Sequence, residues 1–270
     1  MRLDDVRAFV LDIDGTLVHR DGEDVHVQPG AREVLAKIRD SGRPLVLFTN
    51  GSHAPPETFA ADLRAAGLPV ADDELLTPLC SVQTYLRAQQ HRDGSVLVFG
   101  TDSAREYLGR AGVRILDSED ATDAAAVFVA PPAAVDFEEL ERAARAVLRG
   151  ARLLTGSNAP AYAGANGPII SRGAMLTAAI AKASGARPVI VGKPSRAAVR
   201  TISDRLGVPS GELAVIGDDL GMDIALGRLG GSRTILVRSG ISGFVELDQI
   251  AESHRPDAVV DGVAELLDWL

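Results

Sequence analysis

The chain has 270 residues, of which 46% are hydrophobic and 24% charged, and its formal net charge is −9. This composition is ordinary for a soluble globular protein and excludes intrinsic disorder. The acidic balance argues against sequence-independent binding to nucleic acid, which needs clustered Lys and Arg. A single cysteine, Cys80, excludes an intramolecular disulfide and favours a reducing compartment. With an acidic N-terminus and no long apolar run, the sequence predicts a cytoplasmic protein without a membrane span.

Short apolar runs alternate with segments of helical period along the chain. The predicted strands, in chain order, are residues 7–11, 45–48, 96–99, 126–129, 189–191, 213–216 and 234–237. The predicted helices are residues 31–40, 57–66, 103–110, 137–148, 196–206, 223–229 and 263–270. Residues 117–126 and 156–168 are predicted to be irregular. Continuous apolar strands between helices indicate a parallel α/β sheet covered on both faces, which places its sites at the carboxyl ends of the strands.

Two carboxylates follow the first predicted strand, in the sequence Asp12-Ile13-Asp14-Gly15-Thr16. Side chains two residues apart on an extended chain point to the same side, so both face the exit of the sheet. Two anions held there need a cation or a proton to offset them. The pattern favours a Mg²⁺ site or a carboxyl pair with separate acid and base roles. A solvated Asp-Gly turn is the alternative.

Two further strand exits carry groups that suit a phosphate. Thr49 and Asn50 follow the second strand, where a hydroxyl and exposed backbone N–H groups can hold phosphate oxygens. Lys193 follows the strand at 189–191, where its ammonium can neutralise an anion. Taken separately, a plain turn and a surface lysine explain these residues better.

A second group of carboxylates, Asp218, Asp219 and Asp223, follows the strand at 213–216. An N-cap for the next helix would explain these residues without a site. If they face Asp12, they complete an oxygen-rich metal site. This interpretation requires the carboxyl groups of Asp12 and Asp218 to lie close enough to share one ion.

In this order, the four strand ends resemble the motifs of the haloacid dehalogenase (HAD) superfamily, and within it the class IIA, or NagD-like, phosphatases. The resemblance covers essentially the whole chain. It implies a Rossmann-like parallel-sheet core of residues 1–80 and 184–270. It also implies an inserted α/β cap of the C2 type, formed by residues 81–183.

The resemblance implies a role for each motif residue. Asp12 corresponds to the nucleophile that becomes an aspartyl-phosphate, and Asp14 to the general acid that later acts as base. Mg²⁺ would be held by Asp12, the backbone carbonyl of Asp14, and Asp218. The remaining motif positions are the phosphate-binding Thr49, Asn50 and Lys193 and the supporting carboxylates Asp219 and Asp223.

Three stretches depart from the family pattern. The second motif has Gly51 where relatives often have a second Asn, and the fourth has Met222 where they usually have Thr. The cap loop at 157–160 lacks the acidic residue of the family's Thr-Asn-Pro-Asp type. Asn158 and Tyr162, within the irregular segment, are candidate substrate contacts.

The resemblance implies a Mg²⁺-dependent phosphomonoester hydrolase for a small metabolite, such as a sugar phosphate, glycerol phosphate or nucleoside monophosphate. Relatives often dimerise through their caps, so a homodimer is an expectation. One alternative is a phospho-accepting signalling module, which would be shorter and have no cap. The other is a non-catalytic binding protein on the same fold, against which the intact set of carboxylates and lysine argues.

Overall fold

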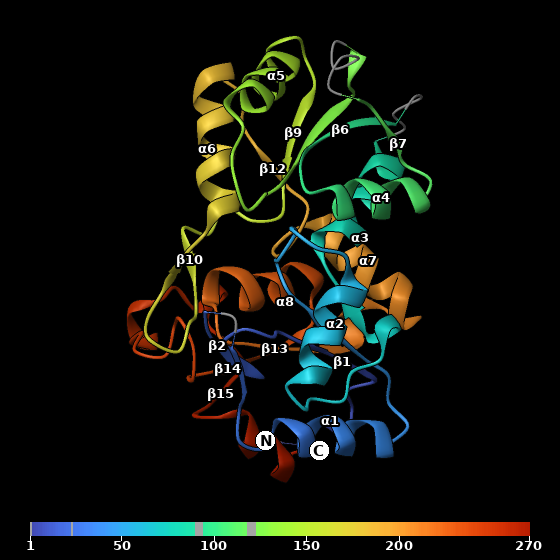
Figure 1. The fold of residues 1–270 in the computed structure, drawn as a ribbon. Coiled ribbons are helices and arrows are strands. Elements are labelled where there is room, and N and C mark those ends of the chain that lie inside the picture. Colours follow the sequence, from blue (N-terminus) through green and yellow to red (C-terminus); the bar gives the residue numbers. More distant parts are fainter. Residues whose placement is uncertain (1, 23, 90–93, 118–122) are drawn as a thin grey trace.

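The structure, a computed structural model, describes residues 2–22, 24–89, 94–117 and 123–270. Two parallel sheets lie one above the other in Figure 1, each between layers of helices. The lower, six-stranded sheet holds both ends of the chain beneath it. Its strands, in spatial order, are β15 (Ala258–Val260), β14 (Arg233–Val237), β13 (Leu213–Gly217), β1 (Ala8–Leu11), β4 (Leu45–Phe48) and β5 (Leu75–Leu76).

Helices cover both faces of this lower sheet because its strands are apolar on both sides. In β1, Phe9 and Leu11 pack into one core and Ala8 and Val10 into the other, as the alternation of a strand requires. The first core is completed by α1 (Ala31–Asp40), α2 (Pro56–Ala65) and the 3₁₀ helix η7 (Val263–Asp268). The second core is completed by α7 (Arg196–Leu206) and α8 (Ala225–Gly230).

The upper sheet is a five-stranded parallel sheet with its own helices. Its strands, in spatial order, are β12 (Val189–Ile190), β9 (Arg152–Thr155), β8 (Ala126–Ala130), β6 (Ser95–Gly100) and β7 (Arg114–Ile115). One core lies toward α3 (Pro78–Ala88) and α4 (Asp102–Arg110), and the other toward α5 (Phe137–Leu148) and α6 (Arg172–Ser184). The α/β alternation predicted for this region therefore forms a separate sheet.

The last strand of the upper sheet determines where Lys193 lies. β12 pairs with β9 in parallel, with Ile190 beside Thr155. It is thus part of the upper sheet, although it lies beyond the boundary expected at residue 183. The chain returns to the lower sheet only after β12. Lys193 therefore lies just beyond the carboxyl end of a strand of the upper sheet.

Two small hairpins join the units at one side of the molecule (Figure 1). The lower unit contributes β2 (Val18–Asp21) and β3 (Asp24–Val27), and the upper unit contributes β10 (Ala161–Tyr162) and β11 (Ile169–Ile170). The backbone N–H of Ala165 donates to the carbonyl of Arg20 at 2.8 Å. The segment predicted to be irregular at 156–168 therefore contains part of a hairpin that contacts the lower unit.

The seven predicted strands are all present with small shifts of their ends, and the predicted parallel α/β class is confirmed. The helices expected at 31–40, 137–148 and 196–206 match α1, α5 and α7 residue for residue. Of the predicted loop at 117–126, residues 118–122 lie outside the described residues, and Ala126 begins β8.

Other elements differ from the prediction. α3 and α6 were not expected; α6 is alanine-rich, which leaves its apolar period indistinct. The segment at 263–270 is the 3₁₀ helix η7. A π-helical turn, η4 (Leu220–Ile224), precedes α8, which therefore begins later than expected. Further short helices in the described part of the chain are η1 (Asp72–Glu74), η3 (Ser210–Glu212), η5 (Leu247–Gln249) and η6 (Glu252–His254). Within the described ranges, none of the helices has the combination of length and apolarity needed to cross a bilayer.

Candidate active site

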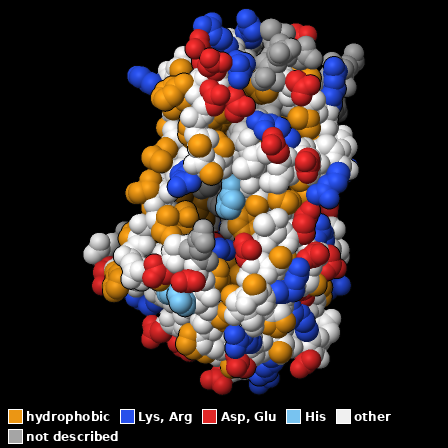
Figure 2. Space-filling view, in the orientation of Figure 1, with side chains coloured by type: hydrophobic (Ala, Val, Ile, Leu, Met, Phe, Trp, Pro, Cys, Tyr) orange, Lys and Arg blue, Asp and Glu red, His pale blue; other side chains and the backbone are white. Residues whose placement is uncertain are grey.

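The site lies where the carboxyl ends of the two sheets face each other. β1 and β13 are neighbours in the lower sheet, and from them the chain continues to opposite sides, to β4 and to β14. Such a switch point leaves a crevice beyond the strand ends, where parallel sheets place their ligands. Figure 2 shows a hollow between the upper and lower parts of the molecule, with charged and histidine side chains beside it.

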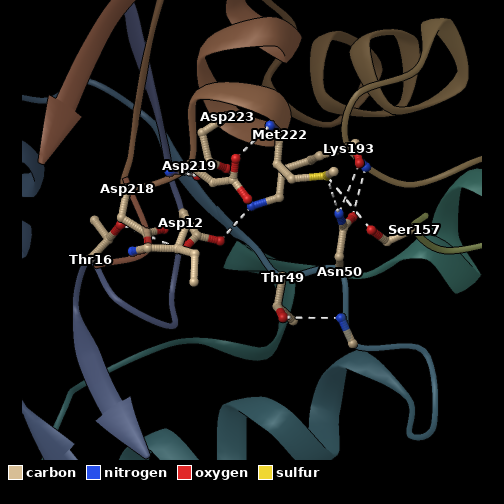
Figure 3. Close-up of polar contacts among 12 residues, drawn as sticks. Asp12, Thr16, Thr49, Asn50, Ser157, Lys193, Asp218, Asp219, Met222 and Asp223 are labelled. Carbon is tan, nitrogen blue, oxygen red and sulfur yellow. Dashed lines mark hydrogen bonds and ion pairs between the residues drawn. The ribbon is translucent and has the colours of Figure 1, made fainter. Parts of the chain in front are cut away.

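Three carboxylates from two strand exits meet in this crevice. One carboxylate oxygen of each of Asp12, Asp218 and Asp223 lies within 4.8 Å of the others. The residues are 9%, 3% and 1% exposed, respectively. The close approach that the sequence interpretation required of Asp12 and Asp218 is therefore present. Asp223, expected as a supporting residue, belongs to the same cluster (Figure 3).

Lys193 lies among these carboxylates and links the two sheets. Its Nζ donates to Asp12 Oδ1 and, at 2.7 Å, to Asp223 Oδ1. The residue is only 2% exposed, so its charge is compensated by protein groups rather than by water. Burial lowers the pKa of Lys193, but the charges of Asp12 and Asp223 outweigh this and raise it above its usual range, so the ammonium stays protonated.

The carboxylates carry more negative charge than Lys193 can offset. Burial, followed by the charges of Asp12 and Asp223, raises the pKa of Asp218 to about 9. Burial also raises the pKa of Asp223 to about 6, against the opposing charge of Lys193. If fully ionised, the three carboxylates and one ammonium would carry a net charge of about −2 in a buried space, and the raised pKa values express the cost of that charge. An oxygen-only donor set of that charge fits a hard divalent cation, which would relieve the repulsion.

Two glycines make room for the Asp218 carboxylate. A Cβ added at Gly15, whose φ is +94°, or at Gly240 would overlap the carboxylate of Asp218. The backbone N–H of Ile241 donates to Asp218 Oδ2 at 2.7 Å. The sequence interpretation missed this 239–242 loop, although it follows the predicted strand at 234–237 and the rule of strand exits would have found it.

Asn50, at the exit of β4, is hydrogen-bonded to the backbone of Lys193. Asn50 Nδ2 donates to the carbonyl of Lys193 at 2.8 Å, and the N–H of Lys193 donates back to Asn50 Oδ1 at 2.7 Å. This pair of bonds fixes the start of the Lys193 side chain, so the Asn50 amide is occupied within the protein. Thr49 is buried, and its Oγ1 accepts from the N–H of Gly51 at 3.1 Å.

Two of the family departures contact one another. Met222 Sδ lies 3.4 Å from Asn50 Nδ2 and 3.6 Å from Ser157 Oγ, which follows β9 of the upper unit (Figure 3). Met222 thus fills the gap between the second motif and the cap loop. Asp219 Oδ1 accepts from the N–H groups of Gly221 and Met222, at 2.7 and 3.2 Å, so this carboxylate caps the π-helical turn.

The other side of the crevice is more open. Asp14 is part-buried, and its Oδ1 accepts from Arg20 Nε at 2.7 Å. Asn158 is exposed and Tyr162 is 40% exposed, so the structure leaves both accessible. Thr16, whose Oγ1 donates to Asp12 Oδ2 at 3.5 Å, was not identified from the sequence as a site residue.

Comparison with known proteins shows which family carries this arrangement. The haloacid dehalogenase-like hydrolase profile matches residues 9–114, and a second HAD-hydrolase-like profile matches residues 190–266. The ribonucleotide monophosphatase NagD of Escherichia coli K12 is 33% identical over 97% of this chain and 98% of its own length. This chain belongs to the haloacid dehalogenase-like hydrolases. The dihydroxyacetone phosphatase of Corynebacterium glutamicum is 28% identical over 97% of this chain and 90% of its own.

Solved structures of this HAD family agree with the fold over its whole length. The p-nitrophenyl phosphatase of Archaeoglobus fulgidus superposes with a TM-score of 0.82 at 29% identity, covering 98% of this chain and 99% of that one. NagD of E. coli K-12 gives a TM-score of 0.82 at 29% identity, covering 98% of each chain. The predicted NagD-like fold and the predicted phosphatase class are confirmed.

Proposed function

We propose that this HAD phosphatase hydrolyses small phosphate monoesters with Mg²⁺ through an aspartyl-phosphate on Asp12. The observation that carries the proposal is the buried cluster of Asp12, Asp218 and Asp223 around Lys193, at the exits of neighbouring strands. Asp12 and Asp218, with the backbone carbonyl of Asp14, are the proposed Mg²⁺ ligands. When bound, Mg²⁺ would offset the repulsion between an attacking carboxylate and a phosphate dianion.

The first step forms a bond between a carboxylate oxygen of Asp12 and phosphorus while the ester P–O bond breaks. Asp14 gives a proton to the leaving oxygen, which departs as an alcohol. Lys193 and Thr49, with the backbone of Asn50, bind the transferring phosphoryl group and stabilise its charge. Dividing one difficult displacement between two easier steps is the advantage of a covalent intermediate.

The second step returns the enzyme to its starting state. Asp14, now a carboxylate, takes a proton from a water molecule as that water attacks phosphorus. The bond between phosphorus and Asp12 breaks, and inorganic phosphate leaves. Asp223 and Asp219 are proposed as supporting groups: Asp223 holds the Lys193 ammonium, and Asp219 keeps the turn that carries Asp223 in place.

The proposed substrates are sugar phosphates, glycerol phosphate or nucleoside monophosphates. Support comes from the relatives, which are named for ribonucleotide and dihydroxyacetone phosphate substrates. The upper unit lies over the lower one (Figure 1), and a cap in this position would disfavour a folded phosphoprotein as substrate. Asn158 and Tyr162 are proposed to contact the substrate from this side.

We also propose a division of the chain into a core and a cap. The core consists of residues 1–80 and 184–270 and the cap of residues 81–183, with β12 completing the cap sheet from beyond that boundary. The single cysteine supports a cytoplasmic location. A homodimer is a prediction that size-exclusion chromatography with light scattering would test directly.

The test of the function is hydrolysis of p-nitrophenyl phosphate by the purified protein, with Mg²⁺ and again after chelation. We expect turnover with Mg²⁺, its loss on chelation and its return when Mg²⁺ is restored. Turnover that survives chelation would contradict the metal-dependent mechanism. No release of phosphate from any of a broad set of phosphorylated metabolites would contradict the phosphatase proposal as a whole.

A further inference from the structure

Arg20 on β2 has a hydrogen-bonding group that none of the described residues engages. Its Nε donates to Asp14 Oδ1 at 2.7 Å, and its side chain is 18% exposed. Its Nη2, however, is buried and meets no acceptor among the residues that the structure describes. Folded proteins rarely leave a buried N–H of a cation unpaired, because burial removes water without replacing its hydrogen bonds. We therefore expect this N–H to have an acceptor beyond the described residues, and a bound ligand would supply one.

The position of Arg20 places that acceptor between the cap and the core. The carbonyl of Arg20 accepts from the N–H of Ala165 in the β10–β11 hairpin, at 2.8 Å. In the same hairpin, the side chain of Ala163 lies against Gly15, the residue after Asp14. The hairpin also carries the part-exposed Tyr162, so the free N–H lies at the side of the crevice where the candidate substrate contacts gather.

A second arginine lies near this side of the crevice. Arg172, at the start of α6 and next to the hairpin, is exposed. Burial and then the charge of Arg20 lower the pKa of His53, and Arg172 acts in the same direction, against Asp14 and Asp62. Arg20 is already paired with Asp14, so Arg172 adds a separate, exposed positive charge that can attract an anion, although Asp62 opposes it.

We propose that Arg20 binds an anionic group on the leaving part of the substrate through Nη2, with Arg172 attracting the same group. The preferred substrates are then small phosphate monoesters that carry a carboxylate a short distance from the ester oxygen. The inference rests on the proposed function, because it takes Asp14 as the group that protonates the ester oxygen. Because Arg20 is hydrogen-bonded to Asp14, an anion bound to Arg20 would lie close to the ester oxygen that Asp14 protonates. The remaining N–H groups of a guanidinium suit the two oxygens of a carboxylate.

The test compares 3-phosphoglycerate with glycerol phosphate, which carries a hydroxymethyl group in place of the carboxylate. For the wild type we expect kcat/KM to be at least about tenfold higher for the carboxylate ester, the factor expected for a hydrogen bond to a charged group. In Arg20→Gln this ratio should fall close to one. Arg172→Gln, which acts over a longer distance, should lower it by roughly two- to threefold, and less at high salt. Arg149→Gln removes the same charge from an exposed position at the end of α5 and should leave the ratio unchanged.

The outcomes separate this inference from the proposed function. A wild-type ratio near one would overturn the inference, and so would an Arg20→Gln variant that loses activity on both esters equally. The second result would mean that Arg20 only orients Asp14. If Arg20→Gln does not fold, the exposed Arg172→Gln change gives the same comparison. By contrast, a wild type that hydrolyses neither ester nor p-nitrophenyl phosphate would contradict the proposed function itself.

Discussion

The two sides of the crevice are built on different principles. One side, here called the phosphoryl side, contains the residues proposed to act on the phosphoryl group. Its Asp12, Lys193 and Asp223 are at most 9% exposed, and each is held by a charged or hydrogen-bonded partner. On the leaving-group side, Tyr162 is 40% exposed and Arg172 is exposed on the surface of the cap. Buried charges depend on one another, so a change in one disturbs the rest, whereas exposed groups can be exchanged at little cost. This contrast suggests that the chemistry is fixed by the core while the choice of substrate can vary with the cap.

The most severe test of the phosphoryl side is Asp12→Asn. Because the amide is a poor nucleophile and a weak ligand for Mg²⁺, we expect kcat on p-nitrophenyl phosphate to fall by at least about 10³-fold. The exposed Asp40→Asn change at the end of α1 removes the same charge and serves as the control. An Asp12→Asn enzyme within tenfold of the wild type would show that another group attacks phosphorus.

Lys193→Met tests how strongly the buried charges depend on each other. Removal of the ammonium leaves Asp12 and Asp223 without their partner, so activity should be lost and the free energy of unfolding should fall by roughly 3–5 kcal/mol without Mg²⁺. Denaturant titration measures the loss, and added Mg²⁺ should restore part of it. The control is Lys182→Met, an exposed change in the last turn of α6. If Lys193→Met without Mg²⁺ is as stable as the wild type, the buried carboxylates do not depend on the Lys193 ammonium.

The pH dependence of stability tests the excess of negative charge. Folding raises the pKa of Asp218 to about 9, so the folded metal-free protein holds this proton more tightly than the unfolded chain does. Asp218 therefore makes metal-free stability decline as the pH rises, from the ordinary Asp pKa near 4 up to about 9. Between pH 6 and 9 we expect the melting temperature in chelator to fall by roughly 5 °C more in the wild type than in Asp218→Asn.

Mg²⁺ should reverse this decline in the wild type, because it replaces the proton as the partner of the carboxylates. The rise in melting temperature on adding Mg²⁺ should therefore be larger at pH 9 than at pH 6. Equal pH slopes for wild type and Asp218→Asn in chelator would show that Asp218 keeps an ordinary pKa in the folded protein.

Gly240→Ala tests the space around Asp218. The added methyl group would overlap the Asp218 carboxylate and push it away from Asp12, so we expect the affinity for Mg²⁺ to fall by about tenfold, with a smaller effect on stability. Activity measured across a Mg²⁺ titration gives the change. Gly211→Ala, where a methyl group meets only ordinary contacts, is the matched control. An unchanged Mg²⁺ requirement would mean that Asp218 is not held in place by this loop.

The smallest effect on activity is expected on the leaving-group side. Tyr162→Ala removes a part-exposed ring from the β10–β11 hairpin, so KM should rise by roughly two- to fivefold while kcat changes less. Tyr162→Phe keeps the ring and separates its packing from its hydroxyl group. A loss of kcat as large as that of Asp12→Asn would remove the contrast between the two sides.

Sequence patterns predicted the phosphoryl side because it depends on strand exits. Buried parallel strands are apolar runs, and the residues after them fall at one edge of a sheet; Asp12 and Asp218 could be identified in this way. An apolar run does not specify its neighbours, however. For this reason the pairing of β12 with β9, and thus the delivery of Lys193 from the upper sheet, could not be predicted.

The leaving-group side was harder to predict because its contacts join distant segments without a periodic signal. The backbone bond between Ala165 and Arg20 connects two short hairpins, and each hairpin has too few residues for an alternating pattern to show. The contact of Met222 with Ser157 joins two positions that depart from the family pattern. The departures could be noticed in the sequence, but their proximity required the fold.

The central claim is that Asp12 is phosphorylated beside an ion shared with Asp218. A crystal structure of the protein with Mg²⁺ and beryllium fluoride, which mimics an aspartyl-phosphate, tests this claim most directly. We predict a beryllofluoride group on a carboxylate oxygen of Asp12, within reach of Lys193, and Mg²⁺ bound by Asp12 and Asp218. A beryllofluoride group on another residue, or Mg²⁺ bound away from both carboxylates, would contradict it.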